Sequence, residues 1–255
     1  MNNNKLAPTV IGVIPARYAS KRLPGKLLLE LRGKPIIEHV YEGAKKARLL
    51  SDVIVATDDE RVSAAVTGFG GSVVMTPLTI QSGSDRVAYA AKNLQADVIV
   101  NIQGDEPLIK PEMIDETVQA LLDDDLVVVS TPVRKISSRE ELSDSNVVKV
   151  VIDENEFALY FSRSIIPFLR SEPNQDIWHK RHHYYKHIGL YVYRKQFLLT
   201  FTQWDSSPLE QAEQLEQLRI LEHGHRIRCV VTEYDSFAVD TPEDLERLKT
   251  IMTKH

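Results

Sequence analysis

A short apolar run near the start of the chain constrains the fold more than any other segment. Residues 10–14 read VIGVI, and no polar residue interrupts the β-branched side chains. Such a run is typical of a strand that is covered on both faces, because a half-exposed strand alternates apolar and polar residues. We expect Pro15 to end the strand. The segment therefore predicts a central strand of a layered α/β fold.

A basic loop follows this strand. Arg17, Lys21, Arg22 and Lys26 lie within ten positions. In doubly wound α/β folds, ligands bind outside the carboxyl ends of the strands, where this loop would lie. Neither a P-loop nor a dinucleotide fingerprint follows the strand, so those motifs do not explain the cluster. The loop predicts a polyphosphate site in which Gly25 lets the backbone approach closely, and a solvated basic loop is the alternative that charge alone favours.

Strand-like and helix-like segments alternate along the rest of the chain, which predicts a largely parallel sheet with helices on both faces. The expected strands are 53–56, 72–75, 98–102, 126–129, 147–152, 158–162, 188–193 and 227–232. The expected helices are 35–47, 59–67, 84–94, 111–122, 209–221 and 242–252. Ser82 and Ser84 are the two candidate N-caps of the third helix.

Composition excludes several classes of protein. The chain has 255 residues, of which 43% are hydrophobic, enough for one large α/β domain or two small ones. The net charge of −5 argues against a general nucleic-acid binder. A single cysteine, Cys229, excludes an intrachain disulfide and a cysteine-based zinc cluster, and is consistent with a reducing compartment. No run reaches the roughly 18 apolar residues of a membrane span, and no secretory leader is visible, so we expect a cytoplasmic protein.

Two aspartates are candidate metal ligands. Asp105 follows the expected strand 98–102 and would lie at the same sheet edge as the basic loop. Mg²⁺ prefers oxygen ligands and usually takes one or two carboxylates together with phosphate oxygens. Asp240 is the second candidate, because it lies between an expected strand and an expected helix that can return to this edge. An aspartate in that position would, alone, more often be a helix N-cap.

Seven segments resemble the cytidylyltransferases that activate acidic sugars, and they occur in that family's order over nearly the whole chain. They are IPARYASKRLPGKLL (14–28), QSGSDR (81–86), NIQGDEP (101–107), ALYFSR (158–163), KHIGLYVY (186–193), PLEQAEQLEQLR (208–219) and VDTPEDL (239–245). The resemblance implies a Rossmann-like nucleotidyltransferase fold. It also implies transfer of CMP from CTP to 3-deoxy-manno-octulosonate, with release of pyrophosphate, for lipopolysaccharide assembly. An 8-amino analogue and a sialic acid remain alternative acceptors.

The resemblance also assigns roles at the nucleotide site. It implies that Arg17 and Lys26 contact the triphosphate, that Arg22 assists, and that Asp105 and Asp240 hold Mg²⁺. Positioned cations and metal would stabilise the charge that develops on the leaving pyrophosphate. Further nucleotide-binding residues are expected in the loop 81–84, at the start of the next helix and after the strand 98–102: Gln81, Ser82, Ser84, Arg86 and Gln103. Gln103 has the alternative of satisfying backbone groups at the strand end.

The acidic sugar requires a cationic partner. Arg163 is the candidate, because its planar guanidinium matches the two oxygens of a carboxylate. The further candidates for the sugar hydroxyls are His187, Tyr191, Glu210, Gln211 and Gln214. The histidines His179, His182, His183 and His187 have a zinc site as the minor alternative to a solvated basic segment beside the sugar site.

The resemblance implies one nucleotidyltransferase domain over residues 1–255. Its expected parts are a nucleotide-binding core at 8–134, a sugar-binding and dimerisation lobe at 135–200, and a C-terminal return to the core at 201–255. A homodimer would form through the lobe. Two other classes of function are weighed against this one. A glycosyltransferase would typically carry paired acidic ligands in one short turn and would have no use for the basic loop, and a non-catalytic nucleotide sensor would be expected to lose the metal carboxylates.

Overall fold

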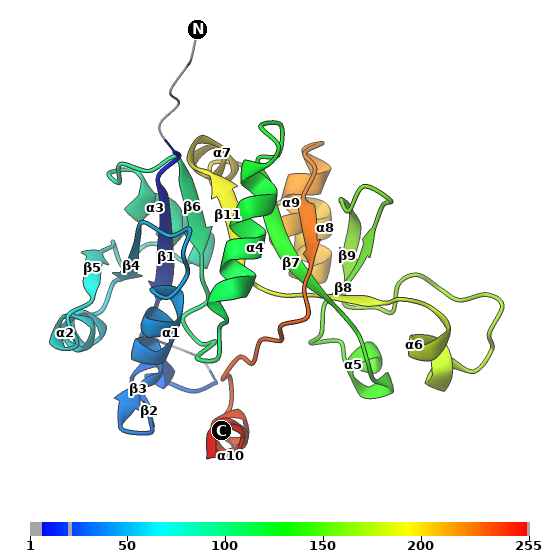
Figure 1. Ribbon diagram of the computed structural model, residues 1–255, viewed down its shortest axis with the longest axis horizontal. Coiled ribbons are helices and arrows are strands. Elements are labelled where there is room, and N and C mark those ends of the chain that lie inside the picture. Colours follow the sequence, from blue (N-terminus) through cyan, green and yellow to red (C-terminus); the bar gives the residue numbers. More distant parts are fainter. Residues whose placement is uncertain (1–6, 20–21, 254–255) are drawn as a thin grey trace, which may run out of the picture. The chain divides into compact units, whose positions relative to one another are not determined.

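The chain forms two compact units (Figure 1). The computed structural model describes residues 7–19 and 22–253. Unit 1 takes its described residues from Met1–Asp115, Val192–Thr202 and Ser236–His255, and unit 2 consists of Glu116–Tyr191 and Gln203–Asp235. The functional parts expected at 8–134, 135–200 and 201–255 stay predictions.

Unit 1 is built on a parallel sheet. Strand β1 (Val10–Ala16) pairs in parallel with β4 (Asp52–Thr57) on one side and with β6 (Val98–Asn101) on the other. Strand β5 (Ser72–Met75) is parallel to β4, and β11 (Tyr191–Arg194) lies next to β6. The apolar run that begins β1 is buried along its whole length, as its continuous pattern predicts. The predicted α/β class and the parallel arrangement are therefore confirmed in this unit.

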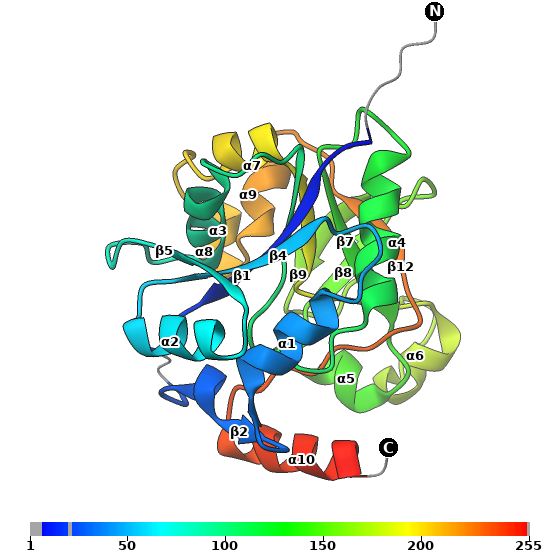
Figure 2. The same cartoon turned by 60° about the vertical axis from the view of Figure 1, so that its left-hand side comes forward.

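Helices cover both faces of this sheet. Figure 2 shows α1 (Ile36–Ala44) and α2 (Glu60–Gly68) on one face and α3 (Gly83–Ala91) and α7 (Lys195–Phe201) on the other. This arrangement follows from right-handed crossovers between parallel strands. Ser82 caps α3 by accepting a hydrogen bond from the Asp85 N–H at 2.9 Å, which decides between the two predicted caps. The remaining elements of the unit are η1 (Lys26–Leu28), β2 (Glu30–Leu31), β3 (Lys34–Pro35) and α10 (Pro242–Thr253).

The expectation that Pro15 ends the first strand is wrong. Strand β1 continues to Ala16, and Pro15 lies in register with Ala56 of β4. The Val13 carbonyl, on the β6 side, accepts from Ile102 N at 3.0 Å, where the pairing with β6 ends. Alternate residues of a strand turn their backbone groups to the same side, so the N–H that Pro15 lacks would have no partner strand there.

Unit 2 contains a mixed sheet. The strands β7 (Val129–Lys135), β10 (Tyr185–His187), β8 (Lys149–Ile152) and β9 (Ala158–Ser162) are antiparallel neighbours in that order, and β12 (Arg228–Val231) is parallel to β7. The predicted pair of strands before and after a turn near 153–156 is confirmed by β8 and β9. The helices are α5 (Arg139–Ser143), η2 (Gln175–Ile177), α6 (Trp178–Arg181), α8 (Pro208–Glu213) and α9 (Gln217–Glu222). Helix α4 (Pro111–Leu122) starts in unit 1 and ends in unit 2.

Three sequence predictions in the second half of the chain are wrong in detail. The expected helix 209–221 is two helices, because Gln214 adopts a left-handed conformation with φ 53°. The expected strand 126–129 starts only at Val129, since Leu126 is 89% exposed and its N–H bonds the Asp124 carboxylate in a turn. The expected strand 188–193 is interrupted where Leu190 N–H donates to Ile188 O at 2.8 Å in a three-residue turn. No helix in the described part of the chain is both long and apolar enough to cross a membrane.

Candidate active site

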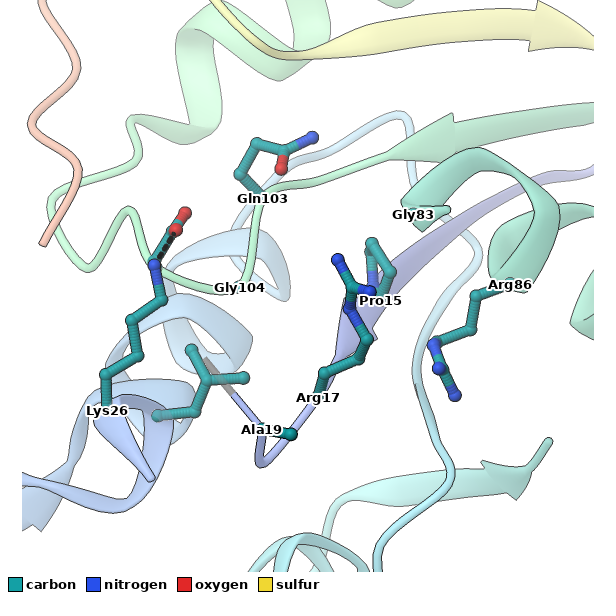
Figure 3. A pocket seen from close by; sticks show the side chains of 10 residues that line it. Pro15, Arg17, Ala19, Lys26, Gly83, Arg86, Gln103 and Gly104 are labelled. Carbon is teal, nitrogen blue, oxygen red and sulfur yellow. Dashed lines mark hydrogen bonds and ion pairs between the residues drawn. The ribbon is translucent and has the colours of Figure 1, made fainter. Parts of the chain in front are cut away.

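A cavity of about 240 Å³ lies at the carboxyl end of β1 in unit 1 (Figure 3). Five of the residues that line it follow one of two strands. Arg17 and Lys26 follow β1, and Gln103, Gly104 and Asp105 lie in the loop after β6. This is the sheet edge at which the sequence predicted a polyphosphate site. Lys21 of the predicted basic loop lies outside the described residues.

Two glycines shape the loops around the cavity. Gly25 has φ 68°, and its N–H donates to Tyr18 O at 2.9 Å, so the basic loop folds back on itself just before Lys26. A Cβ at Gly104 would lie 3.1 Å from the Pro15 carbonyl oxygen, so glycine lets the loop after β6 pack on the end of β1 without a shift of either segment. Both sharp turns therefore place charged residues at the cavity.

Lys26 lies between the two predicted metal ligands. Its Nζ is 2.5 Å from Asp105 Oδ2 and 2.9 Å from Asp240 Oδ1. Arg22 Nη2 is 2.7 Å from the other oxygen of Asp240. Partial burial by itself would lower the pKa of Lys26, but the charges and hydrogen bonds of Asp105 and then Asp240 outweigh it and hold the pKa above its ordinary value. Residues that are far apart in sequence thus form one cluster of alternating charge.

The side chain of Asp240 is available because a different residue caps the following helix. Thr241 Oγ1 accepts from Asp244 N at 3.2 Å, and Asp244 Oδ2 accepts from Asp240 N at 3.1 Å and from Thr241 N at 2.9 Å. Val239 N–H donates to Asp105 O at 2.9 Å and ties the two acidic segments together. Asp240 therefore faces Lys26 rather than capping α10, which was the alternative for an isolated aspartate.

The donor set fits a magnesium ion. Asp105 and Asp240 each present an oxygen within hydrogen-bond distance of one point, the Lys26 Nζ, so both can approach a common cation. Two carboxylates together with phosphate oxygens are the ligands that Mg²⁺ usually takes. Among residues 7–19 and 22–253, no group of three or more His, Cys, Asp or Glu side chains is arranged to hold a metal ion. The pair would therefore need phosphate or water oxygens to complete an octahedral shell.

The loop after β5 forms another wall of the cavity. Arg17 Nη1 donates to the Gln81 carbonyl at 2.5 Å, so it is the backbone of Gln81 that meets the basic loop. Gly83 and Arg86 line the cavity, whereas Ser84 is buried and Ser82 is engaged as the N-cap of α3. Of the predicted nucleotide-binding residues, five line the cavity: Arg17, Lys26, Arg86, Gln103 and Asp105. Their role in binding a nucleotide stays a prediction. Behind the cavity wall, Asp58 bonds Arg86; the sequence did not single it out, because nothing distinguishes it there from its neighbour Asp59.

The predicted sugar-binding residues lie in unit 2. Arg163 donates from its guanidinium to the carbonyl oxygens of Glu213, Ser145 and Gln214. The Glu213 carboxylate, which the sequence did not single out, accepts from Ser162 Oγ at 2.6 Å and from Arg163 N at 3.0 Å. The structure therefore brings Arg163 and Gln214 together. Part of the hydrogen-bonding capacity of the guanidinium is used by backbone carbonyls.

His187 and Tyr191 also meet, with ring centroids 5.1 Å apart. Burial lowers the pKa of His187 to about 3, so its ring is neutral at physiological pH. One ring nitrogen lies 3.0 Å from Thr131 Oγ1. The His187 ring is thus held in its uncharged form, and in the described part of the chain it does not share a metal site with His179, His182 and His183.

Glu210, Gln211 and Gln214 lie in and just after α8. Both oxygens of Glu210 accept from Arg219, at 2.8 and 2.6 Å, and Glu210 completes a capping box with Ser207. Burial alone would raise the pKa of Glu210, but the Arg219 hydrogen bonds and the backbone N–H of Ser207 lower it. The side-chain amides of Gln211 and Gln214 donate to the carbonyls of Ser206 and Gln211. All three side chains therefore take part in shaping this segment.

The chain is similar to known cytidylyltransferases over nearly its whole length. A family model described as "Cytidylyltransferase" matches residues 11–227. The chain is 52% identical to the 3-deoxy-manno-octulosonate cytidylyltransferase of Geobacter metallireducens, covering 94% of this chain and 96% of that protein. It is 50% identical to the protein of the same name from Geotalea uraniireducens, covering 94% and 97%.

Solved structures show the same similarity. A CMP:2-keto-3-deoxy-manno-octonic acid synthetase complexed with CTP has a TM-score of 0.90 and 42% identity, covering 96% of this chain and 99% of that one. A 4-diphosphocytidyl-2C-methyl-D-erythritol synthase from Anaerococcus prevotii, at 13% identity and a TM-score of 0.62, shares the fold alone.

Proposed function

The chain belongs to the cytidylyltransferase family, and from this we infer that it transfers CMP from CTP to 3-deoxy-manno-octulosonate and releases pyrophosphate. Relatives that carry this name are about 50% identical over more than nine tenths of the chain. The observation that ties the activity to this structure is the cluster of Lys26, Asp105 and Asp240 beside Arg17 in one cavity. That cluster supplies both the cations that a triphosphate requires and the carboxylates that a metal requires.

Arg17 and Lys26 bind the triphosphate in this proposal, and Arg22 assists. Negative charge grows on the pyrophosphate as its bond to the α-phosphorus breaks. Fixed cations stabilise that charge more than the charge of bound CTP, and this difference lowers the barrier. Lys26 is suited to the role because the raised pKa keeps it charged and the Asp105 contact fixes its direction.

We assign Mg²⁺ to Asp105 and Asp240, on the fit of their oxygens to a common cation. Bound there, it would neutralise phosphate charge and polarise the phosphorus–oxygen bonds. Lys26 and Arg22 currently satisfy both carboxylates. We assign recognition of the cytosine edge to Gln103 and to the loop from Gln81 to Ser84. Arg86 supports this loop through its bond to the Ile80 carbonyl.

The acidic sugar is assigned to unit 2. Arg163 is supported as the carboxylate partner because a guanidinium has five N–H groups, and three of them donate to carbonyls of the described residues. His187 and Tyr191 are assigned to sugar hydroxyls, since a neutral imidazole can both donate and accept. Glu210, Gln211 and Gln214 are assigned to the same site on the family resemblance.

Three further assignments belong to this proposal. The product would supply lipopolysaccharide assembly, and the protein would act in the cytoplasm, as the single buried thiol of Cys229 supports. The functional form would be a homodimer through residues of the 135–200 segment. Two exposed apolar side chains there, Leu159 at 60% and Phe168 at 72%, support a covered surface.

The test is pyrophosphate release from CTP and Mg²⁺ with 3-deoxy-manno-octulosonate, its 8-amino analogue or a sialic acid as the acceptor. We expect the highest kcat/KM with 3-deoxy-manno-octulosonate. A higher kcat/KM with the 8-amino analogue or a sialic acid would keep the cytidylyltransferase activity but assign a different acceptor. No release with any acceptor, although CTP binds, would refute the transferase assignment.

A further inference from the structure

A buried arginine supports the wall of the CTP cavity from behind. The side chain of Arg86 is fully buried at the start of α3. Its guanidinium donates to Thr76 Oγ1, to Asp58 Oδ2 at 2.7 Å and to the Ile80 carbonyl at 3.2 Å. Arg86 therefore uses its donors on the protein rather than on the open side of the cavity.

Asp58 is the charge partner that makes this burial tolerable. Its side chain is only 14% exposed, and it follows β4 directly, as Thr76 follows β5. A buried cation is stable only when it is paired, and removing one partner leaves an uncompensated charge. Arg86 Nε has no hydrogen-bond partner among the described residues, so the guanidinium has no spare acceptor to replace Asp58.

Two arginines hold two consecutive carbonyls of the same loop. Arg86 holds the Ile80 carbonyl from the buried side, and Arg17 bonds the Gln81 carbonyl from the cavity at 2.5 Å. A shift of the loop at Ile80 would therefore move the acceptor that orients Arg17. The contacts run from Asp58 through Arg86 and the loop to a side chain assigned to the triphosphate.

We propose that Asp58 is a positioning residue for CTP, which acts through Arg86 and the Ile80–Gln81 carbonyls to orient Arg17. This inference rests on the proposed placement of CTP in this cavity. Asp58 itself does not line the cavity, and its effect on CTP is indirect. Its loss should therefore act on nucleotide affinity only as long as Arg17 is present.

The experiment measures the Kd of CTP by calorimetry, with Mg²⁺ and without an acceptor, for a cycle of Asp58→Asn and Arg17→Ala. We expect Asp58→Asn to weaken CTP about tenfold in the wild-type background and by less than twofold in the Arg17→Ala background. Such non-additivity is expected of residues that act through one another, whereas a loss of stability alone would not depend on Arg17.

Asp115→Asn is the matched control. Asp115 is also a shielded carboxylate, with a side chain 11% exposed, and it bonds Arg48 and the backbone of Leu49. Two residues after Leu49, the Ser51 N–H donates to Val10 O at the amino end of β1. The segment that Asp115 holds therefore lies at the end of β1 opposite the cavity. This variant should lose stability and keep the Kd of CTP. Thr76→Val, which removes the other side-chain acceptor of Arg86, covers the case in which Asp58→Asn does not fold, and should weaken CTP at least threefold.

Arg17→Ala tests the placement of CTP, and Asp58→Asn tests the role of Asp58. If Arg17→Ala leaves the Kd of CTP unchanged, the placement of CTP is wrong and the inference fails with it. If Arg17→Ala weakens CTP while Asp58→Asn and Thr76→Val stay within twofold of wild type, only the role of Asp58 is refuted. Equal effects of Asp58→Asn in both backgrounds also refute it.

Discussion

Asp240→Asn tests whether the carboxylate beside Lys26 serves catalysis or stability. The substitution keeps the size of the side chain and removes its charge. Asp240 is 32% exposed, and its partner Arg22 is 62% exposed, so this pair contributes about 1 kcal/mol or less to folding. Lys26 is more buried but retains Asp105. We therefore expect a loss of about 1–2 kcal/mol in the free energy of unfolding, or several degrees in Tm.

The effect on activity should be much larger. If Asp240 helps to hold the metal and to direct Lys26, its neutralisation removes charge stabilisation that is realised in the transition state. Losing one such group typically lowers kcat by about 10²–10³, or about 3–4 kcal/mol. Pyrophosphate release under saturating CTP and acceptor measures kcat, and urea unfolding measures stability.

Glu243→Gln is the matched control, since Glu243 is an exposed carboxylate in the first turn of the same helix. It should keep both kcat and stability close to wild type. A kcat of Asp240→Asn within threefold of wild type would contradict the catalytic role. A large loss of stability, with activity that recovers under stabilising conditions, would show that the carboxylate is structural.

Three further predictions concern other groups. Gly104→Ala should lower kcat/KM at least tenfold with little change in CD spectrum, because its Cβ would lie 3.1 Å from the Pro15 carbonyl and displace Asp105. His187 has a folded pKa of about 3, below its unfolded value of about 6.5, so the unfolded state binds the extra proton between these values and stability falls as the pH falls. Between pH 7.5 and 5.5, the free energy of unfolding measured in urea should therefore fall by about 1 kcal/mol less in His187→Gln than in wild type. An equal fall in both proteins would contradict the neutral ring. Cys229 is fully buried and burial raises its pKa to about 12, so a thiol reagent at pH 8 should label it only after unfolding; rapid labelling of the native protein would refute this.

The convergence of Arg17, Lys26 and Asp105 on one cavity was predictable from sequence because these residues follow parallel strands. The carboxyl ends of β1 and β6 lie at one sheet edge, so Arg17, Lys26 and Asp105 had to approach one another once both strands were recognised. Asp240 was placed by the family resemblance, and the structure shows why its position works. Thr241 with Asp244 caps α10, which leaves the Asp240 carboxylate to Lys26.

The break in the expected helix 209–221 was not predictable from periodicity. Its apolar spacing continues across Gln214, and nothing in the local sequence requires φ 53° at a glutamine. The left-handed residue is stabilised from a distance, because Arg163 donates to the carbonyls of Glu213 and Gln214. A contribution from a side chain 50 residues away leaves no local pattern.

Asp58 and Asp59 show the same distinction within two adjacent residues. Asp59 caps α2 by accepting from Arg61 N at 2.9 Å, a role that an aspartate before a helix predicts. Asp58 instead pairs with Arg86, 28 positions away. Capping depends on local geometry and can be inferred from spacing, whereas a buried ion pair depends on which side chains the packed strands and helices bring together. The positioning role proposed for Asp58 depends on a contact of the second kind. Such a residue is found only by following the contacts of a buried charge to the cavity.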